Sequence, residues 1–259
     1  MERLYRVSRN GEVFYASERD GALMRAVPTG PSIFEGYVPG PVVEGGLADV
    51  TILAPVQPSK MVCVGLNYRD HAEEMKKKLP PEPMLFLKPS TAVLDPGAPI
   101  LLPPGAGQVH YESELAVVIG RRAHRVTQDH AWDYIFGLTC LNDVTARDIQ
   151  NRDVQYTRAK GFDTFAPFGP CIELGGTRGP RTIEGYVNGT RRQHSSTSNL
   201  IFPIEYLVEY ITYVMTLEPG DIISTGTPSG VGAIVDGDVV TVRIEGVGDL
   251  TNPVRAETP

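Results

Sequence analysis

Residues 110–120 read His-Tyr-Glu-Ser-Glu-Leu-Ala-Val-Val-Ile-Gly, and this stretch organises the rest of the chain. It begins as an alternation and ends as an apolar run, which predicts a β-strand that passes from a cavity into a core. Since side chains alternate faces along a strand, His110, Glu112 and Glu114 share one face. Two carboxylates so placed repel each other unless a cation lies between them, and their oxygens suit Mg²⁺, Mn²⁺ or Ca²⁺. The alternative is a solvated edge strand.

A second acidic position follows downstream. The apolar strand expected at residues 135–141 ends at Asn142 and Asp143, and an acid at the mouth of such a strand is where a third metal ligand is expected. Asp148 is the rival, but it falls in a helical turn and could equally be a surface acid. Lys160 lies in a sparsely charged, aromatic segment, where it is either a catalytic group or a surface lysine with a buried stem.

Residues 70–78 form a charged, helix-prone segment that a pair of prolines ends. Asp70 is the expected N-cap, with Glu73 completing a capping box. His71 and Glu74 stand at i, i+3 on one face, so the carboxylate can hold the imidazole in one tautomer and keep it basic enough to accept a proton from water. The segment therefore predicts a catalytic pair on a lid. The alternative is a surface helix stabilised by Glu–Lys pairs.

A glycine-rich turn closes the set of candidate features. Residues 226–232 contain three glycines and one proline, which expose backbone N–H groups, and Thr227 adds a hydroxyl. Such a turn suits a carboxylate or enolate oxygen. It is not a phosphate-binding loop, because no Gly-Lys-Ser/Thr follows.

Composition and charge exclude several classes of function. The chain has 259 residues, a net charge of −7 and only short, scattered basic clusters, so we expect no nucleic-acid partner. No apolar run approaches the length of a membrane span, and the N-terminus lacks the core of a signal peptide, so we expect no membrane partner. Cys63 and Cys140 lie in apolar, strand-like contexts, which predicts reduced thiols in a cytoplasmic protein.

The chain divides at a polar, proline-containing linker near residues 55–60. Residues 1–54 are rich in Gly and Pro with short β-prone pieces, and Asn10-Gly11 predicts a hairpin turn. We therefore expect a small β-rich N-terminal domain over 1–54 and a larger catalytic domain over 60–259.

Six motifs, in this order, resemble the fumarylacetoacetate hydrolase family. They are Gly65-Leu66-Asn67-Tyr68-Arg69-Asp70-His71, Phe86-Leu87-Lys88-Pro89-Ser90, His110-Tyr111-Glu112-Ser113-Glu114-Leu115, Asn142-Asp143-Val144-Thr145-Ala146-Arg147-Asp148, Lys160-Gly161-Phe162-Asp163-Thr164-Phe165 and Gly226-Thr227-Pro228-Ser229-Gly230-Val231-Gly232. The sequence is most similar to the 2-hydroxyhepta-2,4-diene-1,7-dioate isomerase, 5-carboxymethyl-2-hydroxymuconate isomerase-decarboxylase and acylpyruvate hydrolase branches. The resemblance covers residue 60 to the C-terminus.

The resemblance implies an α+β fold, with a mixed β-roll or sandwich catalytic domain, a homodimer, and Mg²⁺ or Mn²⁺ as cofactor, with Ca²⁺ as an alternative. The expected site has catalytic residues His71, Glu74 and Lys160, substrate contacts Arg69, Arg147, Gly226 and Thr227, and metal ligands Glu112, Glu114 and Asp143.

We expect an enzyme that acts on a small 2-oxo acid through its enolate, which a metal and Lys160 stabilise. If His71 and Glu74 activate water, it hydrolyses an acylpyruvate or fumarylpyruvate. If no water is admitted, it isomerises or decarboxylates a dicarboxylic 2-oxo acid in aromatic-compound catabolism. The alternatives are an oxaloacetate decarboxylase or sugar-acid dehydratase of the same family, and a non-catalytic protein stabilised by metal. A serine hydrolase is disfavoured because Gly-x-Ser-x-Gly is absent.

Overall fold

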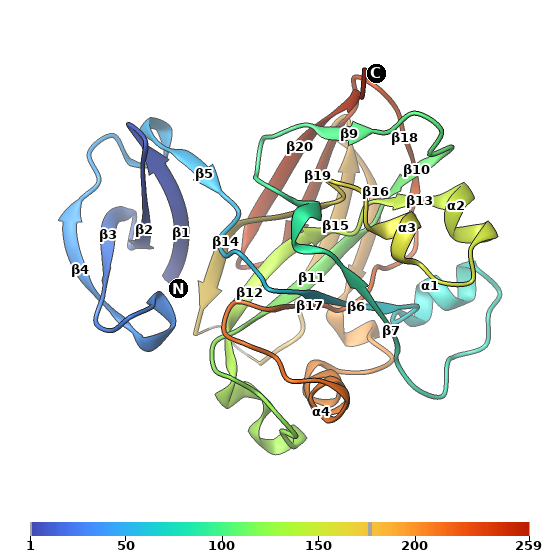
Figure 1. The fold of residues 1–259 in the computed structure, drawn as a ribbon, viewed down its shortest axis with the longest axis horizontal. Helices are drawn as coiled ribbons and strands as arrows, with labels where there is room; N and C mark the ends of the chain where they lie inside the picture. The colour runs from blue at the N-terminus through green and yellow to red at the C-terminus, as the bar shows by residue number, and fades with distance from the viewer. Residues whose placement is uncertain (1, 176–177, 259) are drawn as a thin grey trace.

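The computed structural model describes residues 2–175 and 178–258, and it consists mainly of β-strands with short helices (Figure 1). Within this part of the chain, the largest sheet has twelve strands. Ten of them lie in the order β4 (Tyr37–Val42), β3 (Ala22–Pro28), β2 (Glu12–Arg19), β1 (Glu2–Arg9), β14 (Ala166–Leu174), β12 (Ile135–Asn142), β11 (Ser113–Ile119), β17 (Ile222–Ser224), β6 (Met61–Gly65) and β7 (Met84–Lys88), while β5 (Thr51–Leu53) pairs with β1 and β8 (Val93–Leu94) with β14.

Two smaller sheets and the helices complete the body. The first sheet contains β13 (Thr145–Ala146), β10 (Val109–Tyr111) and β18 (Gly232–Ile234), and the second contains β16 (Thr190–Ser196), β15 (Thr182–Val187), β19 (Val239–Ile244), β20 (Gly248–Ala256) and β9 (Ile100–Leu102). The α-helices are α1 (Arg69–Glu74), α2 (Arg147–Arg152), α3 (Thr157–Lys160) and α4 (Ile204–Val214). Short 3₁₀ turns cover Ile33–Glu35, Gly46–Asp49, Ser90–Ala92, Gln128–Asp133 and Thr197–Asn199. The sheets mix parallel and antiparallel pairs, which confirms the expected α+β fold.

Local sequence explains several of these elements. The turns at Asn10-Gly11 and Asn188-Gly189 have positive φ at both residues, the conformation that Asn-Gly hairpins require. Helix α4 buries Leu207, Val208 and Ile211 on one side, as its periodicity predicts. In the described part of the chain, no helix combines the length and the hydropathy that crossing a membrane requires.

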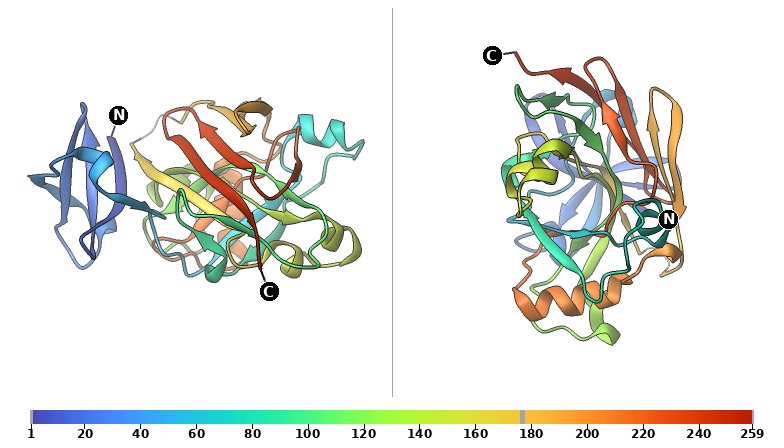
Figure 2. Two further views of the ribbon diagram at one scale, coloured as in Figure 1. Left: turned by 90° about the horizontal axis from the view of Figure 1, so that it is seen from above. Right: turned by 90° about the vertical axis from the view of Figure 1, so that its right-hand side faces the viewer.

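The N-terminal strands form a layer at one end of the larger body, as the left view of Figure 2 shows. They are nevertheless part of the same sheet, because β1 pairs antiparallel with β14 and places Leu4 opposite Ile172. Leu4 and Ile33 also belong to the hydrophobic cluster that contains Met61 and Ile222. The division into 1–54 and 60–259 stays a prediction, and the shared sheet and core join the two parts closely.

Three local expectations need correction. Asp70 is not the N-cap: α1 begins at Arg69 with Tyr68 as its cap. The Asp70 carboxylate accepts the hydroxyl of Ser195 at 2.5 Å and the backbone N–H of His71 at 2.7 Å. The helix ends at Glu74, four residues before the expected end, because Lys76 adopts a positive φ of 51°. The strand expected over 110–120 is divided at Glu112 into β10 and β11, which belong to different sheets.

Candidate active site

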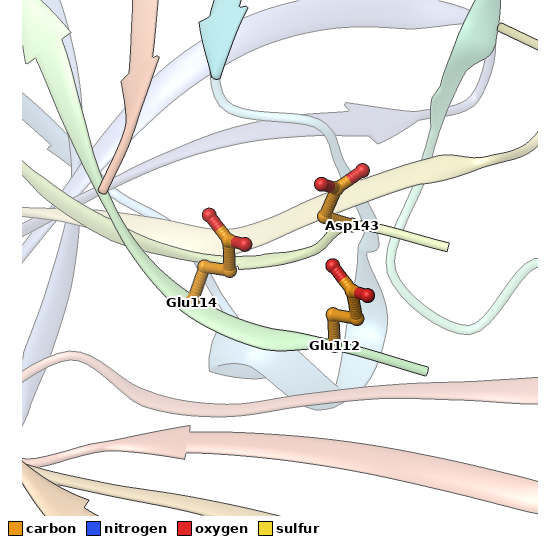
Figure 3. Close-up of side chains that lie close together, drawn as sticks. All are labelled: Glu112, Glu114 and Asp143. Carbon is orange, nitrogen blue, oxygen red and sulfur yellow. The ribbon is translucent and has the colours of Figure 1, made fainter. Parts of the chain in front are cut away.

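Three carboxylates converge at the break between β10 and β11 (Figure 3). Glu112 lies in the break, Glu114 on β11, and Asp143 directly after β12. Strand β11 pairs with β12 through Ser113 and Asn142, and this pairing brings the backbone N–H of Asp143 to 2.9 Å from the carbonyl of Glu112. The three side chains are buried, and one oxygen of each lies within 4.8 Å of the others. The structure therefore assembles the predicted metal ligands.

Cationic side chains neutralise two of the three carboxylates. The ammonium of Lys160 donates to Glu112 at 2.8 Å and to Asp143 at 2.6 Å. Lys88 donates to the other oxygen of Asp143 at 2.6 Å, and Arg147 donates to Glu112. Burial acts to raise the pKa of Glu112, but the charges of Lys160 and Arg147 outweigh it and lower this pKa to about 2. Burial acts to lower the pKa of Lys160, but the negative charges of Asp143 and Glu112 outweigh it and raise this pKa.

Glu114 has a different environment. Its carboxylate accepts the Ser224 hydroxyl at 2.5 Å and the backbone N–H of Gly226 at 2.8 Å, and neither donor carries a charge. Burial, with the negative charges of Asp143 and Glu112, raises its pKa to about 8. No cationic side chain is bonded to Glu114, so a bound cation would stabilise its charged form. The donor set, three carboxylate oxygens, fits Mg²⁺ or Mn²⁺.

The predicted catalytic pair is formed on α1. The Nδ1 atom of His71 lies 3.0 Å from one carboxylate oxygen of Glu74, and the other oxygen accepts the backbone N–H of Gly230 at 3.0 Å. His71 is only 6% exposed, so the helix rests against the body of the protein. The glycine-rich turn therefore fixes the orientation of Glu74, and Glu74 fixes the imidazole.

A cavity of about 340 Å³ connects the carboxylates with the His71–Glu74 pair. Its wall also contains Lys160, Arg147 and Thr227. The hydroxyl of Thr227 donates to the carbonyl of Ser113 at 3.0 Å. His110 lies in the same wall, where burial and the nearby charge of Arg147 lower its pKa. The volume suits a small ligand.

Two of the expected substrate contacts lie elsewhere in the described structure. Arg69 is exposed and donates to the carbonyl of Leu200 at 3.0 Å, so it does not line the cavity. Gly226 also lies outside the cavity wall, and its N–H is used by Glu114. Asp148, the rival third ligand, is exposed and accepts the backbone N–H of Gln108 at 2.9 Å.

Lys88 is the residue that sequence reasoning missed. It ends β7, is 1% exposed, and donates to Asp143 and to the carbonyl of Val144, the latter at 3.0 Å. The sequence feature that could have identified Lys88 is a single charge at the end of an otherwise apolar strand, within one of the six family-like motifs. Tyr156, Gln150 and Asn151 complete one side of the cavity and were also not predicted.

Comparisons with known proteins agree with this geometry. Residues 60–255 match the family model described as fumarylacetoacetate (FAA) hydrolase C-terminal. The structure of a 2-hydroxyhepta-2,4-diene-1,7-dioate isomerase from Mycobacterium marinum is similar over 100% of both chains, with 43% identity and a TM-score of 0.90. A fumarylpyruvate hydrolase from Pseudomonas aeruginosa, solved with Mn²⁺ and pyruvate, is 32% identical with a TM-score of 0.73 and covers 83% of this chain and 94% of its own.

A mitochondrial oxaloacetate tautomerase of Bos taurus is 42% identical over 205 residues, which are 77% of this chain and 92% of the relative. The similar proteins therefore include an isomerase, a hydrolase and a tautomerase.

Proposed function

The chain belongs to the fumarylacetoacetate hydrolase family and is an enzyme, and from this premise we propose that it converts a dicarboxylic 2-oxo acid through its enolate, by isomerisation or decarboxylation. We further propose that Glu112, Glu114 and Asp143 bind Mg²⁺ or Mn²⁺. The observation that carries the proposal is the convergence of these buried carboxylates, beside Lys160, on one cavity. The protein solved with Mn²⁺ and pyruvate supports the choice of metal and of substrate class.

The residues divide the chemistry between them. When bound, the metal supplies Lewis-acid polarisation of the 2-oxo group. Lys160 adds a fixed positive charge that stabilises negative charge developing on the substrate oxygen. His71 accepts a proton, and Glu74 keeps its imidazole oriented through the 3.0 Å contact. Helix α1 contributes His71 and Glu74 to the cavity wall.

The relatives support isomerisation over hydrolysis. The isomerase is 43% identical to this chain, whereas the fumarylpyruvate hydrolase is 32% identical. The name of the isomerase describes a dioate, an acid with two carboxylates. Hydrolysis of an acylpyruvate is the second candidate. The His71–Glu74 pair favours it, because an oriented imidazole at the cavity can activate water.

Deuterium exchange tests the shared step. Proton NMR in D₂O follows the C3 protons of oxaloacetate and 2-oxoglutarate with Mg²⁺, Mn²⁺ or EDTA, while acetylpyruvate hydrolysis is measured in parallel. We expect metal-dependent exchange that EDTA abolishes and added metal restores. Exchange without hydrolysis supports isomerisation or decarboxylation, and fast hydrolysis supports the second candidate. No metal-dependent exchange or turnover of any of these acids overturns the proposal.

We also propose a cytoplasmic homodimer. Cys63, Cys140 and Cys171 are buried free thiols, which supports a reducing compartment. Strand β7 lies at an edge of the large sheet and exposes Met84 and Leu87, which supports an association surface. Light scattering at micromolar concentration should give twice the 28.2 kDa mass of the chain, and a monomer contradicts the dimer.

A further inference from the structure

The cations of the cavity wall are not equivalent. Lys160 is bonded to Glu112 and Asp143, and Arg147 is bonded to Glu112. Lys77 also lines the cavity, but among the described residues no acid lies within ion-pair distance of its ammonium and no side-chain hydrogen bond engages it. The cavity therefore contains one cation whose charge remains available to a ligand.

Backbone geometry explains why this lysine differs from its neighbours. The left-handed residue Lys76, with a φ of 51°, reverses the chain at the end of α1, and the N–H of Lys77 then donates to the carbonyl of Ala72 at 2.9 Å. Of the three successive lysines, only Lys77 belongs to the cavity wall, while Lys76 and Lys78 are exposed outside it. The sequence thus contains two matched controls beside the residue of interest.

The rest of the cavity wall restricts which part of a ligand Lys77 can contact. The acidic end of the cavity holds the predicted metal ligands, and Met75, Met84 and Phe86 give the wall apolar surface. Glu74 does not compete for Lys77, because its oxygens are engaged by His71 and by the Gly230 N–H. A ligand with its 2-oxo acid group at the metal end and a second anionic group at Lys77 would satisfy both ends.

We infer that Lys77 is a specificity-determining residue that binds the second carboxylate of the dicarboxylic 2-oxo acid; this inference rests on the proposed function. The contact lies at an exposed residue, so its contribution is small and acts on substrate binding rather than on the chemical step. The contact lets the enzyme discriminate dicarboxylic from monocarboxylic 2-oxo acids of equal length, because only the former present a second carboxylate to the Lys77 ammonium.

The test compares 2-oxoglutarate with 2-oxopentanoate, which has the same carbon chain but lacks the second carboxylate. Metal-dependent deuterium exchange at C3 gives kcat and KM for both acids with the wild type, Lys77→Ala and Lys77→Glu, and with the controls Lys76→Ala and Lys78→Ala. We expect Lys77→Ala to raise KM for 2-oxoglutarate about fivefold and Lys77→Glu to raise it further, with kcat unchanged. For 2-oxopentanoate, Lys77→Ala should leave KM unchanged, and both controls should stay within about twofold for both acids.

The outcomes distinguish this inference from the proposed function. If the wild type exchanges both acids and Lys77→Ala affects them equally, or affects neither, the role of Lys77 is overturned while the enolate chemistry stands. An equal effect of Lys76→Ala or Lys78→Ala also overturns it, since general surface charge would then explain the result. If the wild type exchanges oxaloacetate but neither of these two acids, the inference fails and the proposed function stands. If it exchanges none of the three acids and does not turn over acetylpyruvate, both fail.

Discussion

Two parts of the cavity hold their charged groups by different means. The floor comprises the three carboxylates with Lys88 and Lys160, and the lid comprises helix α1 and Lys77, which follows it. On the floor, Glu112 and Asp143 lie next to the paired ends of β11 and β12 and are fixed by the ammonium groups of Lys88 and Lys160, all of them buried. On the lid, His71 is fixed by a single carboxylate of a six-residue helix, and that carboxylate is bonded to one backbone N–H. The floor is a closed network of ion pairs, whereas the lid rests on a few neutral or partly exposed contacts.

This difference has energetic consequences. Removing one partner of a buried ion pair leaves an uncompensated charge and costs about 3–5 kcal/mol, whereas an exposed pair contributes about 1 kcal/mol or less. Floor substitutions should therefore affect every reaction of the enzyme together with its metal binding. Lid substitutions should leave the metal bound and affect only the steps that use the His71 imidazole or the Lys77 ammonium. Substitutions on each side of the cavity test this division.

The largest expected effect is that of Glu114→Ala. Glu114 is the ligand without a cationic partner, so we expect the variant to remain folded by circular dichroism but to lose its metal by elemental analysis. Loss of several kcal/mol of metal-derived stabilisation should lower turnover by about 10³-fold or more. A folded variant with full stoichiometric Mg²⁺ or Mn²⁺ would contradict the assignment of this residue as a ligand.

His71→Ala tests the lid. A base that accepts a proton from water contributes about 10²–10⁴-fold to that step, so acylpyruvate hydrolysis should fall by about two orders of magnitude or more. Oxaloacetate decarboxylation should remain nearly intact, because loss of CO₂ does not require water activation. Metal content should be unchanged. Equal loss of both activities would instead assign His71 to substrate binding or lid closure, and no loss of either would make α1 a surface element without a catalytic role.

Lys88→Met tests whether the buried ion pair between Lys88 and Asp143 contributes to metal binding. Methionine keeps the length of the side chain but removes the ammonium from Asp143, so titration calorimetry should give a metal Kd raised about 10–100-fold. The control is Lys60→Met, which breaks the ion pair with Asp221 outside the cavity wall. The control should lower the thermal midpoint and leave the Kd unchanged. An unaltered Kd in Lys88→Met would limit Lys88 to a structural role.

The smallest expected effect is that of Asp148→Ala. This acid lies five residues after Asp143 but is exposed and accepts only the backbone N–H of Gln108. We expect metal Kd and turnover within about twofold of the wild type, in line with other surface substitutions. A loss of metal comparable to that in Glu114→Ala would move the third ligand from Asp143 to Asp148.

Some features followed from the sequence because their causes are local. Strand alternation put Glu112 and Glu114 near each other, the end of an apolar strand marked Asp143, and helical spacing paired His71 with Glu74. The break at Glu112 did not prevent the convergence, since both glutamates still reach the same site. The Asn10-Gly11 hairpin was predicted correctly for the same reason, because it depends on a few neighbouring residues.

Other features were decided by contacts between distant segments. The burial of Lys88 and Lys160 depends on β7 and α3 meeting the ends of β11 and β12, and no local pattern reports which charges will share a low-dielectric site. Asp70 bonds Ser195 instead of capping α1, and β1 joins the main sheet through β14, because β16 and β14 supply those partners from over a hundred residues away. Periodicity determines which face a side chain occupies; only tertiary packing determines what charge it meets there.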